Sequence, residues 1–257
     1  MKKFFLALTF LITLLAGCAS TRPTPQALTT NRAQVLLLGE VHDSADGHRE
    51  RFAYLQSLIE AGWRPAIGME QFDRENQTAL DAALKSCTNA DCILATPGLR
   101  LPNWNWDFYK PVLELALRHQ LRIIAVNLSR ADATQVVRNG FAASFDSATM
   151  QARGLDRPLP DAVLVPQREE IIEGHCNKLP ANLVTGMTNA QVARDIWMAQ
   201  LIAPYAAQGV VLLAGNGHVR QDIGVAYWLR QGGTLQPVIS IAFGTPAPDQ
   251  ACDFTPK

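Results

Sequence analysis

The sequence predicts an α/β domain with a central, mostly parallel sheet flanked by helices. Short continuous apolar runs alternate with stretches of helical periodicity, and the clearest of the runs have no polar face. A strand that is apolar throughout has to be covered on both sides, as happens in a parallel sheet between two layers of helices. The alternating order of strand and helix is also the order in which such a sheet is built.

Five apolar runs are the predicted strands. The first and the fourth, VLLLGE and VVLLA, are the most uniformly apolar, and we expect both to be interior strands. Pro237 stands in the fifth run and favours a sheet edge or a strand start, because proline cannot donate a hydrogen bond to a neighbouring strand. In chain order the runs occupy residues 35–40, 65–70, 122–128, 210–214 and 235–243.

Helical patterns fill the intervals between the runs. Apolar residues recur at helical spacing after the first run, and Gly62 follows them as a stop signal. The stretch from Thr188 to Gln191 resembles a capping box and predicts the start of another helix. Residues 129–186 contain no strand-like run, and we interpret them as a helical insertion, or lid, over the sheet.

The N-terminus has the pattern of a bacterial lipoprotein precursor. Lys2 and Lys3 precede an apolar run that ends at Leu15. This run is too short to cross a bilayer, which takes about 20 helical residues, but it has the length and flanks of a signal-peptide core. The sequence LAGC that follows resembles a lipobox, so we predict a signal peptide over residues 1–17 and a lipid on Cys18.

We predict that a tether connects the lipid on Cys18 to the folded domain of the mature protein. Residues 18–31 are rich in Thr and Pro, with one Gln and no periodicity, and the domain itself spans 32–257. Several acyl chains on Cys18 would anchor it to the membrane, since each buried methylene contributes about 0.8 kcal/mol. Ala19 stands where an aspartate would suggest inner-membrane retention in Gram-negative export. This favours the periplasmic face of the outer membrane over the inner membrane or the cell surface.

Charge and cysteine content further limit what kind of protein this is and which ligands it can bind. Lys plus Arg equals Asp plus Glu at 23 each, so the chain has no basic footprint for nucleic acid. Four cysteines remain beyond Cys18 in an oxidising compartment. We pair Cys87 with Cys92, which close a small loop; Cys176 then pairs with Cys252 or stays free. No CxxCH haem-attachment motif and no CxxC zinc spacing is present.

Polar side chains follow three of the predicted strands where each strand ends. Glu40 and His42 end the first run, Glu70 ends the second, and His218 follows the fourth. The carboxyl ends of parallel strands face one crevice, so we expect these side chains to converge. Two imidazoles and two carboxylates can bind a divalent metal or serve as a general acid/base set. A purely structural polar network is the alternative.

An aromatic cluster, from Trp104 to Tyr109, stands at a predicted helix start. Packing between that helix and the edge of the sheet is the favoured interpretation. A lining for a flat apolar ligand is the alternative. Dinucleotide, P-loop, HExxH and GxSxG motifs are absent from the sequence.

These residues also carry a family resemblance. The motifs GEVH at 39–42 and GNGH at 215–218, with Glu70 between them, resemble the paired GxxH motifs and intervening glutamate of the Tiki/TraB/erythromycin-esterase superfamily. Within it, HCNKLP at 175–180 and the helix after it are similar to the ChaN-like haem-binding lipoproteins. The resemblance implies haem binding, a role in iron uptake, and a pair of stacked haems between two protomers, hence a homodimer on haem binding.

The resemblance carries one ligand position onto this chain, His175, which we expect to be an axial ligand of the haem iron. Ligation in the family involves Tyr and His, but the insertion at 129–186 contains no tyrosine. The superfamily also implies an alternative function, a metal-dependent hydrolase that uses the four strand-end residues. The tyrosines of the chain are Tyr54, Tyr109, Tyr205 and Tyr227.

Overall fold

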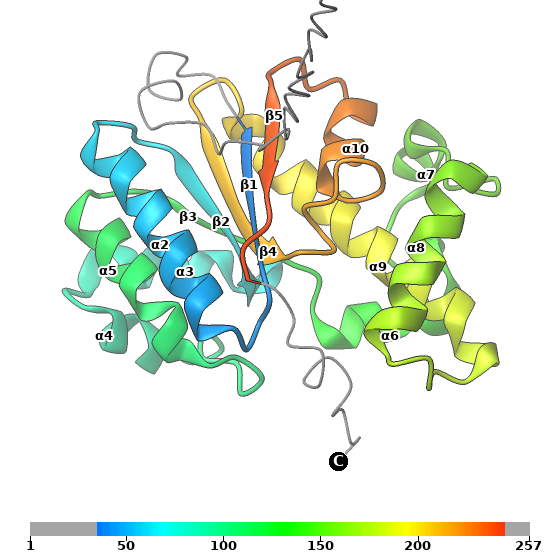
Figure 1. The fold of residues 1–257 in the computed structure, drawn as a ribbon, viewed down its shortest axis with the longest axis horizontal. Helices are drawn as coiled ribbons and strands as arrows, with labels where there is room; N and C mark the ends of the chain where they lie inside the picture. Colours follow the sequence, from blue (N-terminus) through cyan, green and yellow to red (C-terminus); the bar gives the residue numbers. More distant parts are fainter. Residues whose placement is uncertain (1–34, 245–257) are drawn as a thin grey trace, which may run out of the picture.

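A computed structural model describes residues 35–244, and in it one five-stranded sheet lies between two layers of helices (Figure 1). The strand order is β3-β2-β4-β1-β5, and every neighbouring pair is parallel. The predicted fold class is confirmed. The strands are β1 Val35–Glu40, β2 Ala66–Asp73, β3 Ile123–Asn127, β4 Val210–Gly215 and β5 Val238–Ile241.

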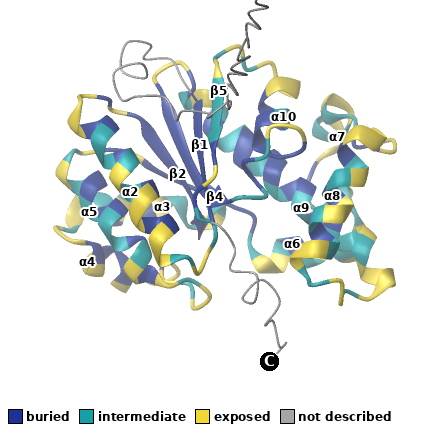
Figure 2. Cartoon of the chain, in the orientation of Figure 1, coloured by how far each residue is buried: buried dark blue, intermediate teal, exposed yellow. Residues whose placement is uncertain are grey.

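The two most apolar runs lie in the interior of the sheet, as predicted. Every residue of β1 and β4 is buried, and each strand has a neighbour on both sides. Figure 2 shows this part of the sheet as the most continuously buried region of the molecule. β5 begins directly after Pro237 and forms one edge of the sheet, in agreement with the position that proline favours.

Helices cover the sheet on both faces because successive residues of a buried strand point to opposite sides. In β1, Leu36 and Leu38 join one apolar core, whereas Val35 and Leu37 join the other. The first core is covered by α2 Ala45–Glu60, α3 Gln77–Ser86, α4 Ala90–Ala95 and α5 Lys110–Arg118. The second is covered by α6 Arg130–Asn139, α9 Ala181–Ile202 and α10 Val225–Gln231.

The segment predicted as a helical insertion is helical, and Figure 1 shows its helices beside α9. It holds α6, α7 Ser147–Arg153, α8 Asp161–Gly174 and the first turns of α9. The predicted start of α9 at Thr188 is wrong. The helix begins after Pro180, and the Thr188 hydroxyl donates to the carbonyl of Val184 inside the helix instead of capping it. Short 3-10 helices lie at Arg74–Asn76, Trp106–Phe108, Phe141–Ala143 and Ala203–Tyr205.

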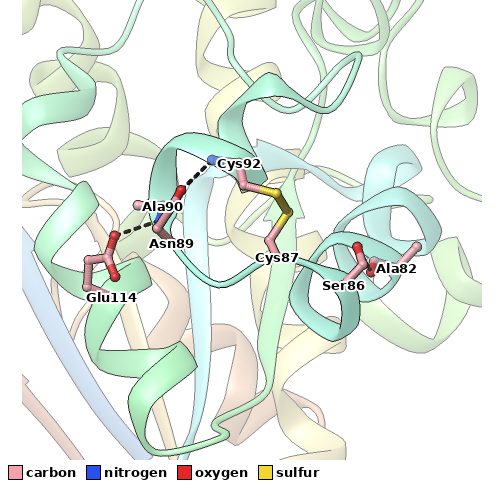
Figure 3. The surroundings of a disulfide bond; sticks show 7 residues. All are labelled: Ala82, Ser86, Cys87, Asn89, Ala90, Cys92 and Glu114. Carbon is pink, nitrogen blue, oxygen red and sulfur yellow. Dashed lines mark hydrogen bonds between the residues drawn. A yellow bond between two sulfur atoms is a disulfide. The ribbon is translucent and has the colours of Figure 1, made fainter.

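The disulfide between Cys87 and Cys92 joins the end of α3 to α4, as the sequence predicted (Figure 3). The Asn89 side chain caps α4 by accepting from the Cys92 backbone amide at 2.9 Å. The predicted signal peptide, Cys18 and the tether lie outside the described residues. Cys252, which is the partner of Cys176 in one of the two alternatives above, lies outside them as well. Between residues 35 and 244 no helix is both long and apolar enough to cross a membrane.

Candidate functional site

Glu40, the last residue of β1, is the centre of a buried polar network. Its side chain is fully buried and accepts hydrogen bonds from the guanidinium of Arg51, from the Tyr109 hydroxyl at 2.5 Å and from His42 at 2.8 Å. Burial alone would raise the pKa of Glu40, but the Arg51 charge and the His42 hydrogen bond together hold it below its ordinary value. Glu40 is therefore a fixed carboxylate.

Glu40 holds the ring of His42 through one of its two nitrogens. Its Nδ1 donates to the Glu40 carboxylate, which leaves the Nε2 lone pair available, and its side chain is 53% exposed. Partial burial lowers the pKa of His42, but the Glu40 hydrogen bond and the charges of Glu70 and Glu40 outweigh this and raise it. An imidazole of this kind can take up and release a proton near neutral pH.

A second imidazole network lies at the ends of β2 and β4. His218 is buried, with Nδ1 2.6 Å from an Asp195 oxygen and Nε2 3.5 Å from a Glu70 oxygen. Burial works against its charge, but the two carboxylates prevail and raise the pKa of His218 to about 10. Burial also raises the pKa of Asp195 to about 6, against the opposing attraction of His218.

Gly215 joins the two networks. Its backbone amide donates to Glu70 at 2.8 Å, and the His42 ring lies so close that a Cβ on Gly215 would be 3.2 Å from the ring Cε1. Against the cost of its burial, His218 and His42 lower the pKa of Glu70, and the Gly215 amide adds to the effect. The structure thus brings the four strand-end residues, Glu40, His42, Glu70 and His218, together at the carboxyl ends of the strands, the place that we call the crevice.

His175 does not join this crevice. It directly follows α8, where its Nδ1 donates to the Ile171 carbonyl of its own helix at 2.7 Å, and its side chain is half-buried. The chain then turns through two residues with positive φ, Cys176 and Asn177. α8 reaches the crevice loop through Glu170, which pairs with Arg220 at 2.7 Å, more than a helical turn before His175.

The four crevice residues as placed do not fit a divalent metal. The oxygens of Glu40 are occupied by Arg51, Tyr109 and His42, and one Glu70 oxygen accepts from a backbone amide. Over residues 35–244, no group of three or more His, Cys, Asp or Glu side chains is arranged to hold a metal ion. The expectation of a divalent metal at these residues is therefore not supported.

Comparison with known proteins places the chain in a family. The family described as "Haem-binding uptake, Tiki superfamily, ChaN" matches residues 27–229. The chain belongs to this family. The family resemblance seen in the sequence is thereby confirmed. No curated protein matches the chain.

Among solved structures, this family member is similar to ChaN of Campylobacter jejuni, whose structure is described as "cofacial heme binding". The TM-score is 0.65 at 20% identity, over 88% of this chain and 87% of that one. This likeness shows a shared fold. A type III effector, HopBA1, is similar at TM-score 0.40 and 13% identity, over 77% and 72% of the two chains. A structure described as bacterial protein toxins is similar at TM-score 0.46 and 15% identity, over 87% of this chain and 37% of that one.

Polar residues other than the four predicted ones also belong to the crevice. Arg51 and His48 come from the inward face of α2, one turn apart, and Tyr109 precedes α5. The sequence signal for Arg51 is its position: it stands at the helical spacing of the apolar residues of α2, where a charged residue is unusual. Asp195, which contacts His218 in this family member, lies in the helix whose sequence carried the family resemblance.

Proposed function

We propose that this protein binds haem for iron uptake, with His175 as an axial ligand. The observation that carries the proposal is the orientation of the His175 ring. A carbonyl acceptor 2.7 Å from Nδ1 fixes the tautomer with the proton on Nδ1 and the lone pair on Nε2. Histidines that ligate metals almost always donate their other N–H to such a partner, which orients the ring.

The helices before and after His175 carry exposed groups that suit a flat apolar ligand with carboxylates. Val165 on α8 and Leu183 on α9 are 47% and 39% exposed, and these are the helices on either side of His175. Arg168 is exposed on α8 seven residues before His175, which puts the two on one side of the helix and supplies a partner for a propionate. Haem would supply an iron that accepts the imidazole nitrogen.

Tyrosine ligation receives no support from Tyr109. Its hydroxyl donates to Glu40, and burial and the Glu40 charge raise the pKa of Tyr109, so it stays a neutral phenol. Haem iron is bound by phenolate oxygen, and the half-exposed His175 is the better placed donor.

We further propose that the carrier is an outer-membrane lipoprotein facing the periplasm, anchored by lipid on Cys18 and tethered by residues 18–31. Haem binding would join two protomers over a pair of stacked haems. The lipobox-like sequence at Cys18 supports the anchor. Val165 on α8 and Leu183 on α9 are exposed apolar side chains that haem and a second protomer would cover in this arrangement.

The test is a haem titration of the purified full chain in detergent, followed by absorption in the Soret region. Wild type should show a shifted Soret band that His175→Ala loses or moves, because the iron loses its imidazole. His119→Ala removes a half-buried histidine at the end of α5 and is the matched control. No shift in wild type would sink the haem carrier, and an unchanged shift in His175→Ala would remove His175 from the ligand set.

A second candidate function is that of a hydrolase, and it rests on the two imidazole–carboxylate networks of the crevice. In this hydrolase, Nε2 of His42 takes a proton from a water whose oxygen bonds to an acyl carbon, and the proton then passes to the leaving oxygen. Glu40 orients the His42 ring, and the charges of Glu40, Glu70 and His218 surround that ring. With p-nitrophenyl acetate as the probe, His42→Ala should lower the rate by about 10² to 10⁴. Activity that is absent in wild type, or equal in His42→Ala, removes this function, and His175→Ala is its control.

A further inference from the structure

A cavity of about 360 Å³ opens beside the crevice in the segment between α4 and α5. This volume lies within the range of roughly 300–1,000 Å³ that small-molecule sites occupy. The aromatic cluster noted in the sequence supplies much of its wall. Neither function proposed above assigns it a role. Its lining residues are Arg100, Leu101, Pro102, Trp104, Asn105, Trp106 and Asp107.

The cavity wall is held from inside the protein. The Trp106 indole N–H donates to the Leu101 carbonyl at 2.9 Å, which ties the two ends of the wall together. The Trp106 ring is buried against Phe72 at 5.3 Å and Tyr109 at 5.9 Å between ring centroids. The Asn105 side chain accepts from the Asp107 amide at 3.3 Å. A wall fixed in this way is formed before a ligand arrives, which lowers the entropic cost of binding.

Two charged residues line the cavity, and Arg100 is the one whose charge is not paired within the described residues. Asp107 pairs with Lys110 at 3.3 Å. Arg100 is exposed at the cavity and has no hydrogen bond or ion pair among residues 35–244. A guanidinium presents a rigid fork of N–H donors that matches a carboxylate, so the free charge of the cavity favours an anionic ligand of that shape.

Trp104 connects the cavity to the crevice. Its ring is half-buried, forms part of the cavity wall, and meets the His42 ring edge-on with centroids 4.9 Å apart. An aromatic wall beside apolar Leu101 and Pro102 suits a flat ring system. A ligand in this cavity would lie one side chain away from the half-exposed imidazole of His42.

We propose that this cavity binds a flat ligand that carries a carboxylate, with the carboxylate on Arg100 and the ring on Trp104. The site is separate from His175 and does not depend on haem ligation there. It supplies the crevice with a binding pocket next to His42.

The experiment is calorimetric titration of the full chain with 2-naphthoate and with uncharged 2-naphthamide. Wild type should bind the naphthoate more tightly than the amide. Arg100→Gln should weaken naphthoate by about tenfold or more and leave the amide unchanged, since a charge-assisted pair is lost. Trp104→Ala should weaken both. Arg118→Gln, which removes an exposed arginine on α5, is the matched control.

Two results would overturn the proposal: no binding of naphthoate to wild type, or equal naphthoate affinity in wild type and Arg100→Gln. Circular dichroism of each variant confirms that it folds. Metal-free protoporphyrin IX, a flat ring with two carboxylates, identifies the source of the ligand. Weaker porphyrin binding in Arg100→Gln assigns the cavity to a porphyrin, whereas a loss confined to naphthoate assigns it to a smaller ligand. Both results keep the site, and the Soret titration of His175→Ala tests haem ligation separately.

Discussion

At the scale of single residues, the crevice depends on partners that come from distant parts of the chain. The sequence indicates Glu40, His42, Glu70 and His218 because they end strands of one predicted sheet. It does not indicate that Arg51 and Tyr109 hold Glu40, or that Asp195 holds His218. These contacts depend on which way a packed helix faces, and apolar periodicity defines that direction only coarsely.

Arg51→Ala should be among the most destabilising changes in the molecule. Arg51 and Glu40 are both buried and hydrogen-bonded to each other, so the change leaves an uncompensated carboxylate in the core. We expect a loss of about 3–5 kcal/mol in the free energy of unfolding, measured by urea denaturation. Arg49→Ala on the same helix breaks an ion pair whose side chains are 72% and 78% exposed, and should change stability by about 0.5 kcal/mol at most. Equal losses in both variants would contradict a buried charge network.

The buried imidazole of His218 predicts how stability depends on pH. Its pKa is about 10 in the folded protein and about 6.5 in the unfolded chain, so folding favours the protonated form. The stabilisation is fully present below pH 6.5 and is lost as the pH rises toward 10. The titration of Asp195, whose pKa is about 6, changes stability at a pH below this window.

Urea unfolding midpoints between pH 6.5 and 10 test this expectation. The wild-type midpoint should fall with pH across the window. His218→Gln, which keeps a polar side chain but cannot be charged, should show a much flatter dependence; the raised pKa of His42 leaves it some slope. Parallel curves for the two proteins would show that His218 is not held in its protonated form.

At the scale of elements, the strands were predicted well and the helix starts less well. Uninterrupted apolar runs identify β1 and β4, and Pro237 places β5 at an edge, because both signals act through the sheet itself. The capping pattern at Thr188 predicts a start for α9 that is too late, because the Thr188 hydroxyl bonds back to a carbonyl within the helix. A capping pattern in sequence does not reveal whether the backbone before it is already helical.

The junction between β4 and the crevice is tight at Gly215. A Cβ there would lie 3.2 Å from the His42 ring, so Gly215→Ala should push that ring slightly and strain its hydrogen bond to Glu40. We expect a loss of about 1–3 kcal/mol in the free energy of unfolding. Gly174→Ala is the control, because nothing lies within 4 Å of its added Cβ and alanine favours a helix. A neutral Gly215→Ala would mean that the junction is looser than described.

At the scale of the whole molecule, the insertion and the crevice are parts of one structure. α9 begins just after the turn that follows His175, and it delivers Asp195 and Gln191 to His218. The Glu170–Arg220 pair adds a second connection, from α8 to the loop after β4. Changes at the crevice can therefore reach the helices that flank His175, although the two sites are separate in the fold.

The last prediction concerns the attachment of the whole protein to the membrane. If Cys18 carries the lipid, Cys18→Ser should move the protein from the membrane pellet to the soluble periplasmic fraction or leave it as uncleaved precursor. Without acyl chains the domain loses the anchor that we propose for it, because the buried methylenes supply the attachment to the bilayer. Ala19→Asp is the matched variant: it keeps the lipid and should shift the protein from outer- to inner-membrane fractions on a density gradient. Mature Cys18→Ser that still sediments with the outer membrane would show that something other than this cysteine holds it there.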